Sequence, residues 1–459
     1  MKTKRAVGNI KYVRLIVLLF LLVAIGIFFA WQYKPTPVPV LIAHPNIVLI
    51  MTDDQNVDSL PVMRKLMGYP EGSWINFSNA YANHSICCPA RATVLTGQYA
   101  STTGVTGNDK GEDLNDTNTL PVWLHKAGYR TGLIGKYLNG FPWDKGAEYI
   151  PPGWDYFKTG GLGGVNGFTK EAVNFINTSN EPFFLYLAYL PPHHWAKPLR
   201  TYANADVYIP PDPPNYNEAD VSDKPTWVRE LPLLSQSTMD TWHTERIASQ
   251  RALLGVDDGI QQIVEALKAK GQLDNTMIIY MADHGFSWGS HRHILKECAY
   301  EECSKFPLLI RSPDVIGNRE ESRLVSNVDL AATIADYAGV IPELPQEGKS
   351  FIPLLTNTAT DWNEEVLLER SGIGKFAFYG IRVPDWKYVE YDNGDKELYD
   401  LTADPYELQN LANQTEHQAR QTELARRLQT LRNAERCTSQ LRELPQGLIS
   451  LICGALRVL

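Results

Sequence analysis

Runs of consecutive apolar residues recur along the chain, and each run is bounded by polar or turn-forming residues. Examples are NIVLIM at 46–51, TGLIG at 131–135, FFLYLAYL at 183–190 and TMIIYMA at 276–282. Unbroken runs rich in Val and Ile are typical of strands whose two faces are both buried, as in a parallel sheet. We therefore predict that each of these runs is a strand of one central sheet.

Segments with a helical period separate the predicted strands. In residues 245–271 the apolar positions recur at helical spacing, and Gly271 closes the segment. Strands that alternate with helices form an α/β fold, here a large, mostly parallel central sheet flanked by helices. Residues 204–235 are rich in Pro, Asp and Asn, which predicts a surface insertion over one end of the sheet.

Beyond residue 361 the pattern changes to short runs. Residues 379–391 and 396–401 are predicted as short strands, and residues 416–436 as a charged helix. We expect a smaller C-terminal α+β subdomain with a short antiparallel sheet. The apolar tail that follows is too short to span a membrane and is expected to pack on the body of the protein.

The N-terminal residues have the pattern of an export signal. Basic residues precede an uninterrupted apolar run at 15–31, which fits either a cleaved signal peptide or an uncleaved membrane anchor. No small-x-small cleavage site is obvious, which favours the anchor, and the basic flank places the rest of the chain outside the cytoplasm. Whether that means a membrane-anchored, periplasmic, secreted, lysosomal or ER-lumenal protein depends on the organism.

These patterns divide the chain into segments. The predicted organisation is a signal or anchor at 1–36, a Pro-rich tether at 37–44, a catalytic domain at 45–360, the C-terminal subdomain at 361–436 and the apolar tail at 437–459.

Composition narrows the classes of function. The 43 Lys and Arg residues stand against 52 Asp and Glu, a net charge of -9, so nothing points to nucleic acid as a partner. An anionic substrate then requires a local basic cluster. The 6 cysteines suit an oxidising compartment, and Cys298 with Cys303 and Cys437 with Cys453 are candidate pairs, although the sequence does not assign the pairing. Sequons for N-glycosylation begin at Asn76, Asn83, Asn115, Asn177 and Asn413.

Acidic residues follow two of the predicted strands directly. Asp53 and Asp54 come after the first run, and Asp283 and His284 come after the last. Open α/β sheets bind ligands at these carboxyl ends. Adjacent carboxylates repel one another unless a cation or proton intervenes, and oxygen-rich clusters select Ca²⁺ or Mg²⁺. The pattern predicts a metal site, although Asp-Asp after a strand also occurs as a helix cap or turn.

Cys87 and Cys88 stand directly before a predicted helix. Pro89 suits the first helical position, so backbone N–H groups point back at the two thiols and attract anions. A reactive group at this place would meet a tetrahedral oxyanion held by the helix amides and by Arg91. The alternatives are a disulfide or two buried thiols.

The spacing of Cys87, Pro89 and Arg91 resembles the Cys-x-Pro-x-Arg motif of the sulfatase family, in which an oxidising enzyme converts the first cysteine into formylglycine. The resemblance runs from Pro45 to about Arg436. It includes LTGQYASTTGV, GLIGKYLNG, GQLDNTMIIYMADHG, KECAYEE, LVSNVDLAATIADYAGV, GKSFIPLL and KELYDLTADPYELQNLA. The resemblance implies an alkaline phosphatase-like fold and a formylglycine-dependent sulfuric ester hydrolase, and the GKYLN form is shared with N-acetylglucosamine-6-sulfatases and heparan-type sulfatases.

The resemblance also implies roles for individual residues. The implied ligands of Ca²⁺, with Mg²⁺ as the alternative, are Asp53, Asp54, Asp283, His284 and the side chain derived from Cys87. The implied catalytic residues are Cys87 as formylglycine, Arg91, Lys136, His193 and Lys296. Arg91 would hold the formylglycine hydrate, and Lys136 and Lys296 would bind the sulfate. His193 would lie near the leaving oxygen, with His194 as its rival, and the further substrate-binding candidates are Asn139 and His291.

The implied mechanism uses the aldehyde hydrate, which carries geminal hydroxyls. One hydroxyl attacks sulfur, and the other, once deprotonated, collapses to the aldehyde and expels sulfate. The chain departs from the family pattern at several positions. Ala90 replaces the usual serine, Leu138 stands where many arylsulfatases have a histidine, and PHHW differs from the commoner Pro-His-x-Pro, which leaves the role of His193 open.

The predicted function is hydrolysis of a sulfate ester on a sulfated sugar or glycosaminoglycan, such as a glucosamine-6-sulfate unit, after maturation by a formylglycine-generating enzyme. A phosphonate or phosphodiester hydrolase of the same superfamily is the first alternative, and parallel assays of sulfate and phosphate esters would separate the two. A non-catalytic relative that binds sulfated carbohydrate is the second alternative. It predicts sugar binding without turnover and without conversion of Cys87.

Overall fold

The computed structural model describes residues 44–440, apart from 69–73, 143, 147, 161, 181, 314–317, 363 and 371–375. The predicted N-terminal signal or anchor, the tether up to residue 43 and the tail beyond residue 440 lie outside this part of the chain. Within the described part, no helix is both long and apolar enough to cross a membrane.

The central sheet has 8 strands in the order β11-β2-β10-β7-β1-β6-β4-β5. The predicted runs are confirmed as its middle strands, which are β7 (Thr276–Ala282), β1 (Asn46–Thr52), β6 (Phe183–Ala188) and β4 (Arg130–Gly135). These strands are parallel neighbours. The outer strands are β5 (Tyr156–Lys158), β10 (Leu308–Arg311), β2 (Trp74–Phe77) and β11 (Arg319–Glu321). Only β10 runs against its neighbours, so the predicted mostly parallel sheet is confirmed.

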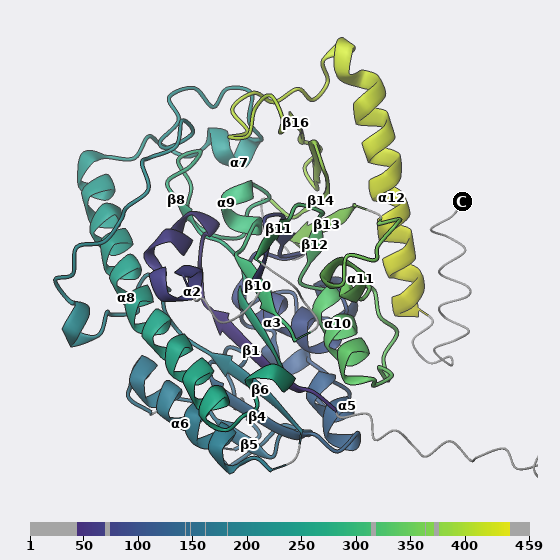
Figure 1. Ribbon diagram of the computed structural model, residues 1–459. Helices are drawn as coiled ribbons and strands as arrows, with labels where there is room; N and C mark the ends of the chain where they lie inside the picture. Colours follow the sequence, from purple (N-terminus) through teal and green to yellow (C-terminus); the bar gives the residue numbers. More distant parts are fainter. Residues whose placement is uncertain are drawn as a thin grey trace, which may run out of the picture. The chain divides into compact units, whose positions relative to one another are not determined.

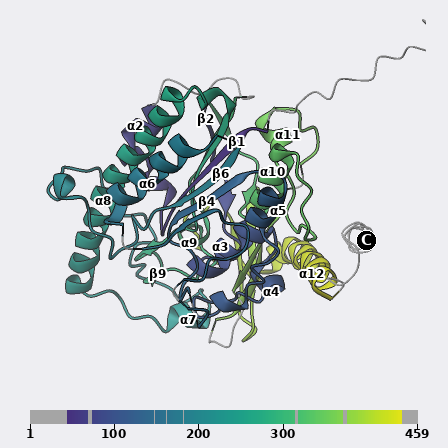
Figure 2. The same ribbon diagram turned by 90° about the horizontal axis from the view of Figure 1, so that it is seen from below.

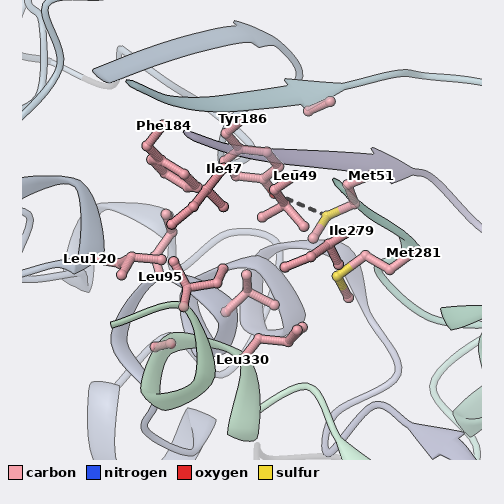
Figure 3. Packing of buried hydrophobic residues seen from close by; sticks show 14 of the residues in the cluster. Ile47, Leu49, Met51, Leu95, Leu120, Phe184, Tyr186, Ile279, Met281 and Leu330 are labelled. Carbon is pink, nitrogen blue, oxygen red and sulfur yellow. Dashed lines mark hydrogen bonds between the residues drawn. The ribbon is translucent and has the colours of Figure 1, made fainter. Parts of the chain in front are cut away.

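Alternate residues of β1 point to opposite faces of the sheet. Ile47 and Leu49 belong to one hydrophobic cluster, and Val48 and Ile50 belong to the other. Every residue of β1 is buried, as expected for a strand covered on both sides. Figure 3 shows the first cluster, in which Leu95 of a helix packs near the side chains of the strand.

Helices cover both faces of the sheet, as Figures 1 and 2 show. The first cluster packs against α3 (Cys87–Thr96), α5 (Leu120–Lys126) and α10 (Asp329–Ala338). The second cluster packs against α2 (Arg64–Gly68), α6 (Gly164–Thr178) and α8 (Gln236–Ala269). The layers therefore form the predicted α/β arrangement.

Helix α8 begins earlier than predicted, at Gln236 and not at Glu245. Ser235 caps it by accepting a hydrogen bond from the Thr238 N–H (3.2 Å). Its buried residues begin only at Arg246. The first turns therefore lack the apolar periodicity from which a helix can be predicted. The predicted end is confirmed, because Gly271 follows the helix with a φ of 68°.

The C-terminal strands form a separate antiparallel sheet, which confirms the predicted subdomain sheet. Its strands, in spatial order, are β13 (Val366–Arg370), β14 (Phe378–Val383), β15 (Trp386–Tyr391) and β16 (Lys396–Asp400). The predicted helix is α12 (Gln418–Gln440), whose Leu424 and Leu428 pack with Ile381 and Tyr388 of the sheet. Strand β13 was not predicted, because its apolar run is only three residues long.

Short elements connect these layers. They are β3 (Ala80–Tyr81), α4 (Ala100–Thr103), α7 (Thr226–Arg229), β8 (Ser287–Trp288), β9 (Ile294–Leu295), α9 (Glu301–Ser304), β12 (Val325–Ser326) and α11 (Ile352–Leu355).

The predicted insertion at 204–235 lies against the β8–β9 hairpin, which follows β7 at the carboxyl end of the sheet. Asn217 makes the connection. Its N–H donates to the Gly289 carbonyl (2.8 Å), and its Oδ1 accepts from the Leu234 N–H (2.8 Å). The insertion therefore ties the hairpin to the start of α8.

Candidate active site

Charged and polar residues follow the middle strands at one edge of the sheet. Asp53 and Asp54 follow β1, Lys136 follows β4, His193 lies in the loop after β6, and Asp283 and His284 follow β7. Parallel strands end at the same edge, so residues far apart in the sequence meet there. The structure brings all of these residues into one buried cluster with Cys87, Arg91 and Lys296.

Cys87 is the first residue of α3, so the helix begins two residues before the predicted position at Pro89. Pro89 lies in the first turn, where its missing N–H costs the helix no hydrogen bond. The Cys87 Sγ lies 3.4 Å from Asp53 Oδ1 and 3.1 Å from Lys296 Nζ. Burial, together with the charge of Asp53, raises the pKa of the Cys87 thiol to about 12.

Asp283 connects the two strand ends to the helix. Its Oδ2 accepts hydrogen bonds from Arg91 Nε (3.1 Å) and Nη2 (2.9 Å), and its Oδ1 accepts from the Asp54 N–H (3.1 Å). Asp54 has a φ of 63°, a left-handed conformation that costs energy for most residues. The bond to Asp283 helps to hold this turn, which points the Asp54 carboxylate into the cluster.

Two lysines approach the aspartates from opposite elements. Lys136 Nζ lies 2.5 Å from Asp53 Oδ2, and Lys296 Nζ lies 2.7 Å from Asp54 Oδ1. Burial opposes the charge of each lysine, but the facing aspartates raise the pKa of both ammonium groups above the usual value. Both side chains keep a 13% exposed fraction, so a ligand can reach them.

The aspartates respond differently to these cations. Burial opposes ionisation of Asp53, but Lys136, Arg91 and Lys296 hold its pKa well below the usual value. Burial raises the pKa of Asp54 to about 7, because Lys296 offsets the loss of solvation only in part. Asp54 Oδ2 has no hydrogen-bond partner among the described residues. The positive charges around Asp54 therefore do not fully compensate its carboxylate.

The donor set fits a divalent cation. His284 Nδ1 lies 2.8 Å from the Gly285 carbonyl oxygen, so Nδ1 carries the proton and Nε2 offers a lone pair. Burial lowers the pKa of His284 to about 4, so the ring is neutral. Its Nε2 faces Asp54 Oδ1 at 3.5 Å and Asp283 Oδ1 at 3.7 Å. Acceptors that face one another in this way need a cation between them.

The two histidines after β6 line one side of the cluster. His193 Nε2 lies 3.4 Å from Asp54 Oδ2, and the rings of His193 and His194 stack with their centroids 4.5 Å apart. Burial lowers the pKa of His193 to about 3 and also lowers the pKa of His194. A ring nitrogen of each histidine lies within 4.8 Å of an Asp54 carboxylate oxygen, so both histidines border the charged cluster.

The further substrate-binding candidates lie in different surroundings. The Asn139 N–H donates to Cys88 Sγ (3.2 Å), which places Asn139 beside the motif. His291 is fully buried elsewhere. Its Nδ1 lies 2.6 Å from Glu218 Oε2, its ring stacks on Tyr300 at 4.0 Å, and its contacts are not with the charged cluster.

His84 is a buried residue that the sequence did not single out. It is 1% exposed, and neither ring nitrogen has a partner among the described residues. Burial, with Arg370 and His284 nearby, lowers the pKa of His84 to about 3. The only signal in the sequence is its position three residues before Cys87, which is too weak to assign a role.

The cysteines divide into two groups. Cys298 and Cys303 form a disulfide, which was one of the candidate pairs, whereas Cys87 and Cys88 are free and buried. The other candidate pair includes Cys453, which lies outside the described residues. Among the sequons, Asn83 is 2% exposed and its Nδ2 donates to the Leu367 carbonyl (2.6 Å), so this asparagine is not accessible in the folded protein.

Comparison with known families decides the identity of this arrangement. The sulfatase family model matches residues 45–340, which is more than half of the chain. The chain belongs to the sulfatase family. A second model, described as the C-terminal part of N-sulphoglucosamine sulphohydrolase, matches residues 289–434. Family membership makes this sulfatase a sulfate ester hydrolase, and it confirms the resemblance found in the sequence.

Two curated sulfatases illustrate the similarity. The N-acetylglucosamine-6-O-sulfatase of Bacteroides thetaiotaomicron is 29% identical over 482 residues, covering 84% of this chain and 86% of the relative. The human N-acetylglucosamine-6-sulfatase is 29% identical over 450 residues, covering 80% of this chain and 81% of the relative.

Solved structures share the fold. One, described as a complex with its substrate D-glucosamine-2-N,6-O-disulfate, superposes with a TM-score of 0.72 at 25% identity and covers 86% of this chain and 98% of its own. The phosphonate monoester hydrolase of Agrobacterium radiobacter superposes with a TM-score of 0.70 at 22% identity, covering 85% and 96%. The second likeness concerns the fold alone.

Proposed function

We propose that this sulfatase removes the 6-sulfate from N-acetylglucosamine or glucosamine units of sulfated saccharides, with formylglycine derived from Cys87 and a bound Ca²⁺ ion. The observation that carries the proposal is the position of the Cys87 Sγ, 3.4 Å from Asp53 Oδ1 and 3.1 Å from Lys296 Nζ. The similar proteins named as N-acetylglucosamine-6-sulfatases support the substrate.

Formylglycine would supply, as its hydrate, the oxygen nucleophile that attacks sulfur. The side chain at position 87 is directed by α3 toward the cluster, and Arg91, one turn further along the helix, lies on the same face. Arg91 Nη1 also donates to the Lys136 carbonyl (3.0 Å), so the helix and the loop after β4 are held together. We assign to Arg91 the orientation of the nucleophile.

Lys136 and Lys296 would bind the sulfate group. Both ammonium groups are charged, lie against Asp53 and Asp54, and remain partly exposed. Fixed cations in a largely buried site stabilise the charge that develops on the sulfuryl oxygens, because no solvent has to reorganise. The local basic cluster that the acidic chain requires is therefore this pair together with Arg91.

Asp53, Asp54, Asp283 and His284 would hold the cation, together with the side chain at position 87. In a sulfatase the cation supplies Lewis-acid stabilisation of the sulfate oxygens. The protein itself prepares the ligands, since Arg91 and the Gly285 carbonyl fix the orientations of Asp283 and His284.

His193 would transfer a proton to the departing sugar oxygen. Its ring lies at the edge of the cluster, its Nε2 is 3.4 Å from Asp54 Oδ2, and its Nδ1 has no partner among the described residues. Because burial lowers the pKa of His193 to about 3, its ring is neutral in the free protein; it would first take up a proton once the substrate is bound and then give it to the leaving oxygen. We also propose that the protein acts outside the cytoplasm, in keeping with its predicted export signal and its disulfide.

Mass spectrometry of the peptide that contains Cys87 tests the modification. In protein from the native host we expect the thiol to be replaced by an aldehyde and the neighbouring Cys88 to stay unmodified. Cys87→Ala should abolish sulfate release from N-acetylglucosamine-6-sulfate, whereas the matched control Cys88→Ala should retain most of it. Parallel assays with phosphonate and phosphodiester substrates examine the alternative activity, and faster turnover of these esters would refute the proposal.

A further inference from the structure

A row of aromatic side chains extends from the edge of the active-site cluster. The Trp195 ring centroid lies 4.5 Å from that of His193, and His194 lies 5.5 Å from Trp242. Trp242 in turn lies 6.1 Å from Trp288. We call the surface formed by Trp195, Trp242 and Trp288 the aromatic ledge. Three separate elements build it, namely the loop after β6, the first turns of α8 and strand β8.

The aromatic ledge is open to solvent beside a buried reaction centre. Trp195 is 54% exposed, whereas large aromatic side chains are mostly covered in folded proteins. Trp242 and Trp288 are partly exposed. An exposed aromatic group of this kind next to a polar cluster is typical of a ligand-binding surface.

The ledge is held rigidly by polar contacts that lie behind it. The Trp288 Nε1–H donates to Asn56 Oδ1 (3.0 Å), and the Asn56 Nδ2 donates to the Phe286 carbonyl (2.8 Å). Asn217 binds both Gly289 and Leu234, as described above, and so fixes β8 relative to the start of α8. The insertion at 204–235 therefore joins the segments that carry Trp242 and Trp288.

His193 connects the charged cluster to the aromatic ledge. Its ring stands between Asp54 of the cluster and the ring of Trp195, and its Nδ1 is buried without a partner among the described residues. A group that leaves the cluster past His193 comes next to the faces of the tryptophans. Sugar rings have apolar C–H faces and hydroxyl edges, which match flat aromatic rings beside unsatisfied polar atoms.

We propose that the aromatic ledge binds the sugar part of the substrate and selects sulfated saccharides over small sulfate esters. This inference rests on the proposed function and deepens it, since it names the residues that recognise the leaving group. Binding energy from a part of the substrate that does not react can be used at the reacting centre, so losing the ledge should raise KM and also lower kcat.

The test compares two substrates on the mature enzyme. For Trp195→Ala and Trp242→Ala we expect kcat/KM to fall at least about tenfold with N-acetylglucosamine-6-sulfate, and less than about threefold with 4-nitrophenyl sulfate, whose phenolate leaves readily without help from binding. The matched control is Trp386→Ala, which removes a tryptophan from the C-terminal sheet and should leave both ratios unchanged. Trp242→Phe keeps an aromatic face and should retain most of the saccharide activity.

Each outcome decides the question. If wild-type enzyme cleaves the saccharide but the ledge variants behave like Trp386→Ala, or lose both substrates equally, the ledge does not recognise sugar. If the wild-type enzyme cleaves 4-nitrophenyl sulfate but no sulfated saccharide, the proposed substrate is wrong, and the role of the ledge is wrong with it.

Discussion

Two groups of buried charges differ in how completely their members are paired. The active-site cluster consists of Asp53, Asp54, Asp283, Arg91, Lys136 and Lys296. A second group, which we call the fold cluster, consists of Glu301, Glu407, Lys387, Arg382 and Tyr81, and it joins α9 to the C-terminal sheet.

The charged side chains of the fold cluster all have hydrogen-bond or ion-pair partners within it or nearby. Lys387 Nζ lies 2.8 Å from both Glu301 Oε1 and Glu407 Oε1 and donates to the Ala299 carbonyl (2.9 Å). Tyr81 donates to Glu301 Oε2 (2.6 Å). Burial opposes ionisation of Glu301, but Lys387 and Arg382 hold its pKa well below the usual value. None of the buried side-chain polar atoms of these five described residues lacks a partner.

The active-site cluster has equal numbers of acidic and basic residues, yet it leaves specific atoms unsatisfied. Asp54 Oδ2, and Nε2 of the adjoining His284, have no hydrogen-bond partner among the described residues. An unpaired buried acceptor costs free energy, so a fold that keeps several of them together holds them for a ligand. Full pairing in a buried charge group thus indicates a role in the fold, and incomplete pairing indicates binding and catalysis.

The largest effect that follows from this contrast is on activity. Asp54→Asn should lower kcat/KM for sulfate esters at least about a thousandfold, about 4 kcal/mol, because the proposed cation ligand and its negative charge are lost together. Asparagine tolerates the left-handed φ of position 54, so the fold is preserved. Denaturant unfolding of the metal-free variant should show a smaller loss of stability than Lys387→Met, because Lys296 loses its partner but the repulsion of Asp54 by Asp53 and Asp283 is relieved. A large loss would place Asp54 with the fold cluster.

The opposite behaviour is expected for Lys387→Met. Removing the shared cation takes the ammonium group away from the buried Glu407 and leaves Glu301 with Arg382 alone, which should lower the free energy of unfolding by about 3–5 kcal/mol. Chemical denaturation followed by circular dichroism measures this change. The control Lys126→Met breaks an exposed ion pair with Glu343 and should cost less than about 1 kcal/mol.

Calcium should stabilise the enzyme through the active-site cluster only. At a calcium concentration of 100 times Kd we expect the free energy of unfolding to increase by about 2.7 kcal/mol, because the ion binds the folded state. Thermal unfolding with calcium and with a chelator measures the difference. The same increase in Asp54→Asn would show that calcium binds elsewhere.

The disulfide should have the smallest effect of the series. Cys298→Ser combined with Cys303→Ser opens a loop with a sequence separation of only 5, and short loops stabilise by about 2 kcal/mol. Denaturant midpoints of the oxidised, reduced and doubly substituted proteins measure the effect. A loss as large as that of Lys387→Met would mean that the bridge supports the whole fold cluster.

Much of the active-site cluster could be predicted from the sequence, because its residues directly follow apolar strands or belong to a compact motif. The runs before Asp53 and Asp283 are long enough to be recognised as buried strands, and parallel strands end at one edge. The early start of α8 could not be predicted, since its first turns do not pack on the core.

The aromatic ledge was equally inaccessible to sequence reasoning. Trp195, Trp242 and Trp288 come from three elements, and the approach of Trp242 to Trp288 involves segments joined by Asn217, which no periodic pattern in the sequence indicates. The fold cluster has the same property. Lys387 and Glu301 are 86 positions apart by their numbers, and each alone looks like a solvated surface charge.

The bridge between Cys298 and Cys303 closes a short loop that contains Glu301, and Lys296 stands just before it. Glu301, which anchors the C-terminal sheet, thus lies inside the covalent ring, and Lys296, the proposed sulfate ligand, lies directly before it. Enzyme produced in a reducing cytosol would keep its C-terminal sheet but lack the disulfide. We expect its affinity for anions to fall more than its free energy of unfolding. Formation of this disulfide in an oxidising compartment would then strengthen anion binding by holding Lys296 in place.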